Sequence, residues 1–107
     1  MILKIDTTKT EKIKVELHSE GKTLDKITKT QKLGSQVLLP MIIKILKRNK
    51  MTFKDLKGIE VNPGPGSFTG TRIGSTVANV LGFALDLPVN GKKGKIVIPK
   101  YEKSKFD

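Results

Sequence analysis

The chain has 107 residues, with 21 lysine and arginine residues against 10 aspartate and glutamate residues and a formal net charge of +11 at pH 7. This length fits one domain, and the absence of cysteine excludes disulfide scaffolds, thiolate metal sites and cysteine nucleophiles. No apolar run is long enough to cross a membrane and the first residues do not read as a signal peptide, so we expect a soluble, cytoplasmic protein without membrane contact.

Three strands are predicted at the start of the chain. Residues 1–7 are rich in strand-forming residues, and residues 12–18 alternate charged and apolar side chains, which is typical of a half-buried strand. Residues 22–30 give a weaker signal because Leu24 and Ile27 are three positions apart. The short connections predict an antiparallel meander.

A helix is predicted over residues 35–50. Ser35 can cap its start, and Lys47, Arg48 and Lys50 suit the negative end of the helix dipole. Pro40 either makes the first turn irregular or delays the regular helix to about Leu38.

The second half of the chain repeats the strand and helix pattern. We expect a strand at 59–62, a glycine-rich loop at 63–70, a helix from about 71 to 85 and a short strand at 88–90. The order βββαβαβ predicts an α/β fold that occupies residues 1–91. Residues 92–107 are predicted to form a basic linker and a strand-like tail, whose apolar triplet 96–98 could add an edge strand or lie against a partner.

The glycine-rich loop is the most specific feature of the sequence. Backbone amides at the start of a helix can hold an anion, but neither a P-loop nor the dinucleotide fingerprint is present, so a phosphate cradle and a purely structural turn both remain open. An aspartate and a threonine at the end of the first strand could add ligands for a metal-bound phosphate, or could serve a turn. The candidate anion residues are Asp6, Thr7, Gly64, Gly66, Ser67, Thr69 and Gly70.

No catalytic constellation is apparent. His18, the single histidine, alternates onto the polar side of its strand and is expected to be exposed. Ser67 and Thr69 lack a partner base, and no pair of carboxylates has a suggestive spacing. We therefore predict a protein that is not an enzyme and uses no metal or cofactor, with ATP and Mg²⁺ entering only if the loop binds a nucleotide.

The two helices carry more apolar surface than one sheet face needs. Apolar side chains cover roughly 240° of the first helix. On the second, small residues recur every four positions and form a groove, while Ile73, Val77 and Val80 are placed on the core-facing arc. The helices either pack only on each other or present an interface to another subunit. The candidate interface residues are Leu39, Ile43, Leu46, Gly70, Gly74, Ala78 and Gly82.

The positive charge has two interpretations. Almost all of it comes from lysine, whereas proteins that read nucleic acids favour arginine and aromatic residues. The lysines therefore indicate either a solvated surface or attraction to a polyanion.

Residues 1–8, residues 38–42 and above all residues 62–74, which read NPGPGSFTGTRIG, resemble the TsaB (YeaZ) family. The resemblance covers residues 1 to about 91 and implies one RNase H-like lobe of the actin-like ATPase superfamily, in a form reduced to the N-terminal lobe. It also implies a non-catalytic subunit of the complex that makes threonylcarbamoyladenosine in tRNA. Its two helices would dock a TsaD-like catalytic subunit or, when the protein is alone, a second copy, with tRNA contacted only indirectly. The alternatives are an actin-like nucleotide-binding protein using Asp6 and the loop, or a basic RNA-binding module.

Overall fold

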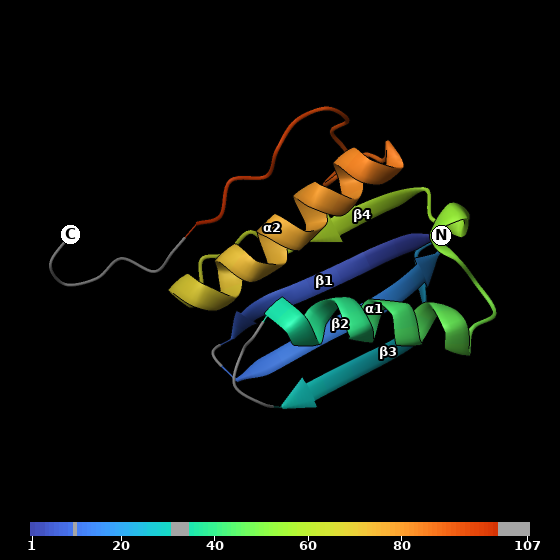
Figure 1. The fold of residues 1–107 in the computed structure, drawn as a ribbon, viewed down its shortest axis with the longest axis horizontal. Coiled ribbons are helices and arrows are strands. Elements are labelled where there is room, and N and C mark those ends of the chain that lie inside the picture. The colour runs from blue at the N-terminus through green and yellow to red at the C-terminus, as the bar shows by residue number, and fades with distance from the viewer. Residues whose placement is uncertain (10, 31–34, 101–107) are drawn as a thin grey trace, which may run out of the picture.

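The computed structural model describes residues 1–9, 11–30 and 35–100. Its four strands form one sheet in the order β3-β2-β1-β4, in which β4 runs parallel to β1 and the other neighbours are antiparallel. Both helices lie on the same face of this sheet (Figure 1). The elements are β1 (Ile2–Lys9), β2 (Lys12–Ser19), β3 (Lys22–Thr30), α1 (Ser35–Arg48), the short 3-10 helix η1 (Phe53–Asp55), β4 (Gly58–Val61) and α2 (Phe68–Leu85).

The predicted meander is confirmed, and the irregular pattern of the third strand has a structural cause. The register between β2 and β3 shifts where Leu17 pairs with Asp25 and His18 pairs with Thr23, so Leu24 lies in a bulge and is exposed. A bulge interrupts the alternation of a strand. This is why Leu24 and Ile27 are separated by three positions and not two.

The helix boundaries differ in part from the prediction. The first helix begins at Ser35 and includes Pro40, which lies on its exposed side. The second begins at Phe68, three residues earlier than expected, because the Ser67 hydroxyl accepts a hydrogen bond from the Gly70 N–H at 3.0 Å and caps the helix.

The predicted strand at 88–90 is reduced to an isolated bridge between Val89 and Ile59. The side-chain amide of Asn90 accepts from the Val61 N–H at 2.8 Å and donates to the Val61 carbonyl at 3.0 Å. A side chain thus satisfies backbone groups of β4 that a neighbouring strand would otherwise bind.

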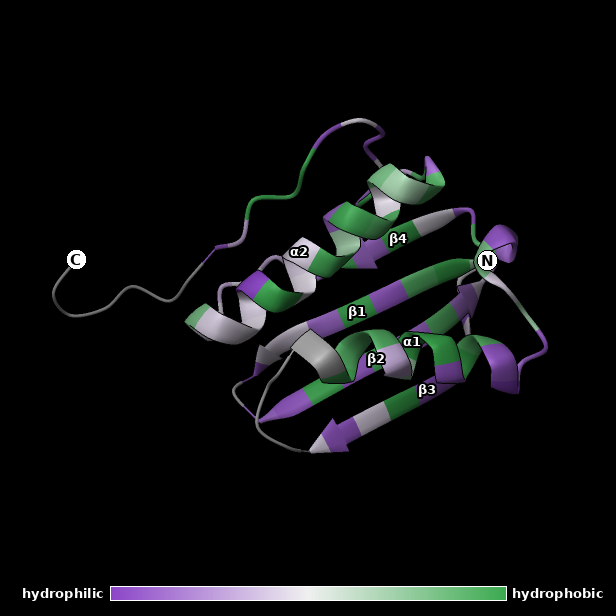
Figure 2. Cartoon of the chain, in the orientation of Figure 1, coloured by the Kyte–Doolittle hydropathy of each residue, from purple (hydrophilic) through white to green (hydrophobic). Residues whose placement is uncertain are grey.

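The core lies between the sheet and the helices. Alternate residues of β1 and β2, namely Leu3, Ile5, Ile13, Val15 and Leu17, are buried against the helices, while their neighbours in the sequence face away. Figure 2 shows this alternation as successive green and purple segments along the strands. The first helix contributes Leu38, Met41, Ile42, Ile45 and Leu46 to the same core.

The small residues of α2 face its own sheet, which corrects the prediction that they belong to an interface with another subunit. Gly70, Gly74, Ala78 and Gly82 are all buried. A Cβ atom at Gly74 would overlap the Thr7 hydroxyl, and one at Gly82 would overlap Val89. Since the side chains of the sheet fill the space under α2, the helix approaches closely only where it has almost no side chains of its own.

The tail runs alongside α2, on the flank turned away from α1, and forms no strand within residues 96–100 (Figure 1). The Asn79 amide donates to the Val97 carbonyl at 2.9 Å and accepts from the Val97 N–H at 2.8 Å, and the Lys100 N–H donates to the Pro63 carbonyl at 2.6 Å. The tail therefore lies against its own chain. Within the described residues, neither helix combines the length and apolarity needed to span a membrane.

Replacing Gly74 by valine tests the close packing of α2. We expect Gly74→Val to lower the free energy of unfolding by about 2 to 3 kcal/mol, because the new side chain must displace Thr7 or lift the helix. Thr76→Val, on the exposed side of the same helix, is the matched control and is expected to change it by less than about 0.5 kcal/mol. Urea unfolding followed by circular dichroism measures both, and equal effects of the two variants would contradict the packing described here.

Candidate functional site

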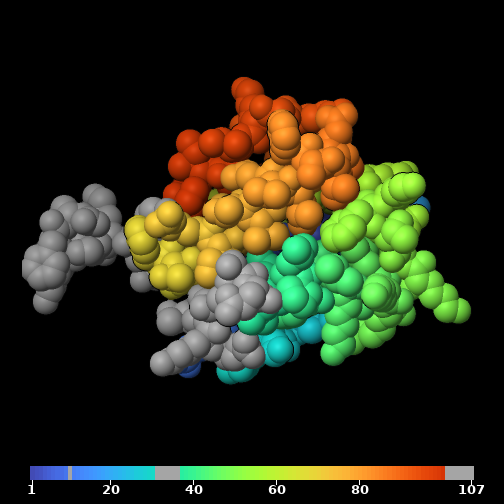
Figure 3. All heavy atoms as spheres, in the orientation of Figure 1, coloured from blue at the N-terminus to red at the C-terminus, as the bar shows by residue number. Residues whose placement is uncertain are grey.

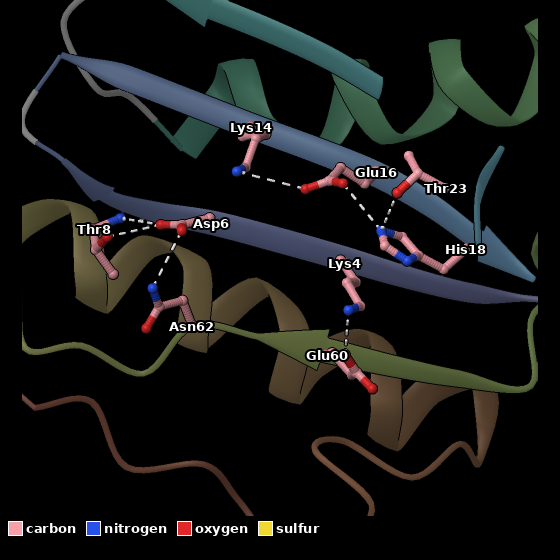
Figure 4. Close-up of polar contacts among 9 residues, drawn as sticks. All are labelled: Lys4, Asp6, Thr8, Lys14, Glu16, His18, Thr23, Glu60 and Asn62. Atoms are coloured by element: carbon pink, nitrogen blue, oxygen red, sulfur yellow. Dashed lines mark hydrogen bonds and ion pairs between the residues drawn. The ribbon is translucent and has the colours of Figure 1, made fainter. Parts of the chain in front are cut away.

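The outer face of the sheet, which is turned away from both helices, carries a polar depression of about 470 Å³. The pairings of Lys4 with Glu16 and of Asp6 with Lys14 place these charged side chains together on that face (Figure 4). The depression is lined by Lys4, Ile5, Asp6, Lys14, Glu16, Glu60, Val61, Asn62 and Asn90. Among the residues that the structure describes, no group of three acidic or histidine side chains could hold a metal ion.

Asp6 is held by its own chain. One carboxylate oxygen accepts from the Thr8 N–H at 3.0 Å and from the Thr8 hydroxyl at 2.7 Å, and the other accepts from the Asn62 amide at 3.2 Å. Partial burial raises the pKa of Asp6, but these hydrogen bonds and the charge of Lys14 outweigh it, so the pKa lies below its usual value. Asp6 is therefore a charged, restrained carboxylate.

The other charges on this face pair with one another. Lys4 lies 3.2 Å from Glu60, Lys14 lies 3.6 Å from Glu16, and the His18 ring lies 3.0 Å from Glu16. The hydrogen bond with His18 is the main cause that lowers the pKa of Glu16. His18 lies on the polar side of its strand, as predicted. It is less exposed than expected, with 16% of its side chain accessible, because Glu16 and Thr23 enclose the ring.

The predicted anion residues do not converge on one point. Thr7 points to the opposite side of the strand from Asp6, is fully buried under α2 and donates to the Gly70 carbonyl at 2.6 Å. The Gly64 N–H is bound by Asn62, and the Gly70 N–H is bound by Ser67.

The remaining loop residues fit a structural turn. The Ser67 N–H donates to the Thr8 carbonyl at 2.8 Å, and a Cβ atom at Gly66 would overlap Thr8. Thr69 is exposed at the start of α2. The hydrogen bonds of the loop thus anchor it to β1 and cap α2, and they leave fewer amides for an anion.

The second candidate site is the surface formed by the helices, in which the structure retains two of the predicted residues. Leu39 and Ile43 are exposed, as an interface requires, whereas Leu46 is buried. Leu46 is covered because the chain folds back over the end of α1, where the Met51 N–H donates to the Leu46 carbonyl at 2.8 Å and Leu56 joins the core.

The exposed apolar residues of α2 escaped the sequence analysis. Val80 is 60% exposed and Phe83 is 92% exposed, although Val80 was predicted to face the core. Counting 100° per residue from the small, buried side of α2 places both side chains on the opposite side. The stripe of small residues was the signal for this exposure. When the stripe is placed against the sheet, the helical period puts Val80 and Phe83 on the side that faces away from it.

We call the apolar side chains on the sides of the two helices that do not face the sheet the helix face. Because Val37 and Lys44 of α1 line a depression with β3, Leu39 and Ile43 lie on the other flank, toward α2. The two helices are in contact and together make up much of the view in Figure 3. The helix face consists of Leu39 and Ile43 from α1 and of Ile73, Val77, Val80 and Phe83 from α2.

Asp6→Asn tests the restrained carboxylate. The pKa of Asp6 is lower in the folded state than in the unfolded state. The contribution of Asp6 to stability is therefore complete above its unfolded-state pKa of about 3.9, and it is lost as the pH falls through its folded-state pKa. We expect Asp6→Asn to reduce the free energy of unfolding by about 0.5 to 1 kcal/mol at pH 7, with the difference disappearing toward pH 2. Glu60→Gln is the control, since its ion pair with Lys4 is exposed and contributes little. Urea midpoints across this pH range measure both, and a constant difference for Asp6→Asn would contradict the assignment.

Comparison with known proteins identifies a family model and several relatives that this chain matches. The model of the family TsaD, tRNA N6-adenosine threonylcarbamoyltransferase, matches residues 11–91. TsaB of Escherichia coli is 36% identical over 84% of the chain and 38% of its own length, and TsaB of Haemophilus influenzae is 35% identical over 82% and 37%. The tRNA N6-adenosine threonylcarbamoyltransferase of Vesicomyosocius okutanii is 33% identical over 84% of the chain and 27% of its own length.

A solved structure agrees with these relatives. YeaZ from Pseudomonas aeruginosa superposes with a TM-score of 0.75 at 36% identity over 82% of this chain and 41% of that one. The chain thus spans about two fifths of the length of the TsaB relatives it matches, and its sheet and helices have the actin-like, RNase H-like fold. The chain belongs to the TsaB (YeaZ) family, of which it represents the N-terminal region.

Proposed function

We propose that the chain is a non-catalytic subunit of a complex that makes threonylcarbamoyladenosine in tRNA, and that it docks a TsaD-type catalytic subunit through the helix face. The observation that carries the proposal is the exposure of large apolar side chains on both helices, Phe83 and Val80 on α2 and Leu39 and Ile43 on α1. Large apolar side chains gathered on one face are typical of a surface that a partner covers. Aromatic residues at the centre of such a surface usually provide most of the binding energy.

The match to the TsaD model supports a partner of the same fold. Two proteins that share a fold can pair through equivalent faces related by an approximate twofold axis, as the two copies of a homodimer do. The helix face would then meet the corresponding helices of the catalytic subunit. When that subunit is absent, the same face would pair with a second copy of this chain.

A supporting role agrees with the chemistry of the described side chains. His18 is bound by Glu16, and the Asp6 carboxylate is bound by Thr8 and Asn62. The Thr8 hydroxyl donates to Asp6, and the Thr23 hydroxyl and Glu16 both contact the same nitrogen of His18, Nε2, whereas a nucleophile–base–carboxylate triad uses the two ring nitrogens separately. The transfer of the threonylcarbamoyl group and the main contact with tRNA are therefore assigned to the partner.

Charge substitutions on the helix face test the docking. We expect Phe83→Asp and Ile43→Asp to weaken the complex with the TsaD-type subunit of the same organism by about 30-fold each, which corresponds to about 2 kcal/mol. Leu24→Asp introduces the same charge at an exposed apolar residue of β3 and is the matched control, expected to change the affinity less than about threefold. Calorimetry with the purified pair measures the affinity. A complex that tolerates both helix-face variants, or one that Leu24→Asp disrupts equally, would contradict the proposal.

Calorimetry with ATP and Mg²⁺ tests the rival nucleotide-binding function. Since Asp6 is already hydrogen-bonded and the loop amides of Gly64 and Gly70 are occupied, we expect the isolated chain to bind the nucleotide more weakly than about 1 mM. Micromolar binding that Asp6→Ala abolishes would favour the rival instead.

A further inference from the structure

The basic residues are distributed very unevenly along the chain. No lysine occurs between residues 58 and 91, which contain β4 and α2, whereas most of the lysines lie in the first 57 residues. Arg72, the one basic residue of that segment, packs over the Phe68 ring at 5.5 Å. A general preference for lysine would affect the whole chain equally. β4 and α2 thus carry a single basic residue of their own, whereas β3 and α1 carry several, and only the tail brings Lys93 and Lys95 beside α2.

Several of the basic residues lie on the neighbouring elements β3 and α1. β3 is the open edge of the sheet, and α1 lies beside it on the covered face (Figure 1). Lys29 of β3 and Lys44 of α1 line the same depression. Figure 2 shows strongly hydrophilic segments along β3 and at the end of α1, and much less on α2. We call these lysines the basic edge and define it as Lys22, Lys26, Lys29, Lys44 and Lys47, all of them exposed, with Lys26 opposite Glu16 on the outer face of the sheet.

The nearest carboxylate of β3 is already neutralised. Arg48 donates from Nε and Nη2 to the two oxygens of Asp25 at 2.8 and 2.6 Å, and the Asn49 amide donates to it at 2.7 Å. These hydrogen bonds, first those from Arg48, hold the pKa of Asp25 far below its usual range. Within the described part of the chain, none of the lysines of the basic edge forms an ion pair. Their charge is thus available to a partner.

Protection of the sheet edge explains only part of this pattern. Lysines on an edge strand prevent pairing with other strands, which is sufficient for Lys22, Lys26 and Lys29. It does not explain Lys44 and Lys47, which lie on a helix.

The composition of the basic edge also indicates the kind of partner. Lysine ammonium groups contact phosphates as point charges, and the sequence from Lys22 to Lys47 contains no aromatic residue that could stack on a base. Such a surface fits a phosphate backbone and not a base sequence.

We infer that the basic edge contacts the phosphate backbone of a structured RNA, which in the setting of the proposed function is a tRNA. Only the choice of tRNA rests on the proposed function; the contact with phosphates rests on the distribution of charge. The basic edge includes the flank of α1 that faces β3, whereas the helix face includes the flank that faces α2. The chain can therefore hold the catalytic subunit and add phosphate contacts to the same tRNA at once.

A charge-reversal series with the full chain and a labelled tRNA transcript tests this inference. The edge variant combines Lys26→Glu, Lys29→Glu and Lys47→Glu. The control variant combines Lys92→Glu, Lys95→Glu and Lys100→Glu, which are exposed outside the basic edge and change the net charge equally. Fluorescence anisotropy at several salt concentrations gives the affinity and its salt dependence.

We expect the edge variant to bind tRNA at least about tenfold more weakly than the unchanged chain. The negative slope of log K against log salt should become shallower by about 2 to 3. The control variant is expected to lose less than about threefold, and arginine at the three edge positions is expected to preserve binding. Equal losses in the edge and control variants would show that only the net charge matters and would overturn the inference. So would undetectable binding of the unchanged chain, or binding to vesicles containing an anionic phospholipid in place of tRNA.

The two proposals fail independently. All three edge positions are exposed, so the edge variant should keep its thermal midpoint and its affinity for the TsaD-type subunit. Loss of tRNA binding with that affinity retained supports the basic edge, while loss of subunit binding in the helix-face variants with tRNA binding retained supports the docking surface. An edge variant that no longer binds the catalytic subunit would overturn the separation of the two surfaces.

Discussion

Gly74 brings the backbone of α2 against the Thr7 hydroxyl of β1, and Thr7 in turn donates a hydrogen bond to the Gly70 carbonyl at 2.6 Å. This contact decides which side of α2 faces the sheet. Once the small residues face inward, the large apolar residues of the helix must lie on its flank and its outer side. The exposure of Val80 and Phe83, and with it the helix face, is a consequence of close packing at Gly74.

The same contact explains why β1 separates two chemical environments. Successive residues of a strand point to opposite faces, so Thr7 is buried under α2 while Asp6 and Thr8 lie on the outer face of the sheet. The glycine-rich loop must pass from the end of β4 to α2 above Thr8, and Gly66 and Ser67 are held there. The loop thus positions α2, and the outer face keeps a network of paired charges around Asp6 and Glu16.

The two proposed surfaces differ in the physics of binding as well as in position. The helix face would bind by burial of apolar area, which changes little with salt, whereas the basic edge would bind by release of counterions, which salt opposes strongly. The Arg48–Asp25 ion pair contributes to this division, because it joins α1 to β3 and removes a negative charge from the basic edge. A single small lobe can therefore offer separate surfaces to a protein and to an RNA.

The strands of the meander, both helices and the family could be predicted from the sequence, because alternation, helical periodicity and the residues 62–74 are local signals. Leu39 and Ile43, two residues that the sequence predicted at an interface, are exposed. The sequence could not decide which side of α2 meets the sheet, since a stripe of glycines permits close approach by any neighbour. Nor could it show which partners Thr7 and Asp6 find on the two faces of the sheet, or that Leu46 is covered by the return of the chain. Those facts depend on contacts between residues far apart in the sequence, which only the tertiary structure brings together.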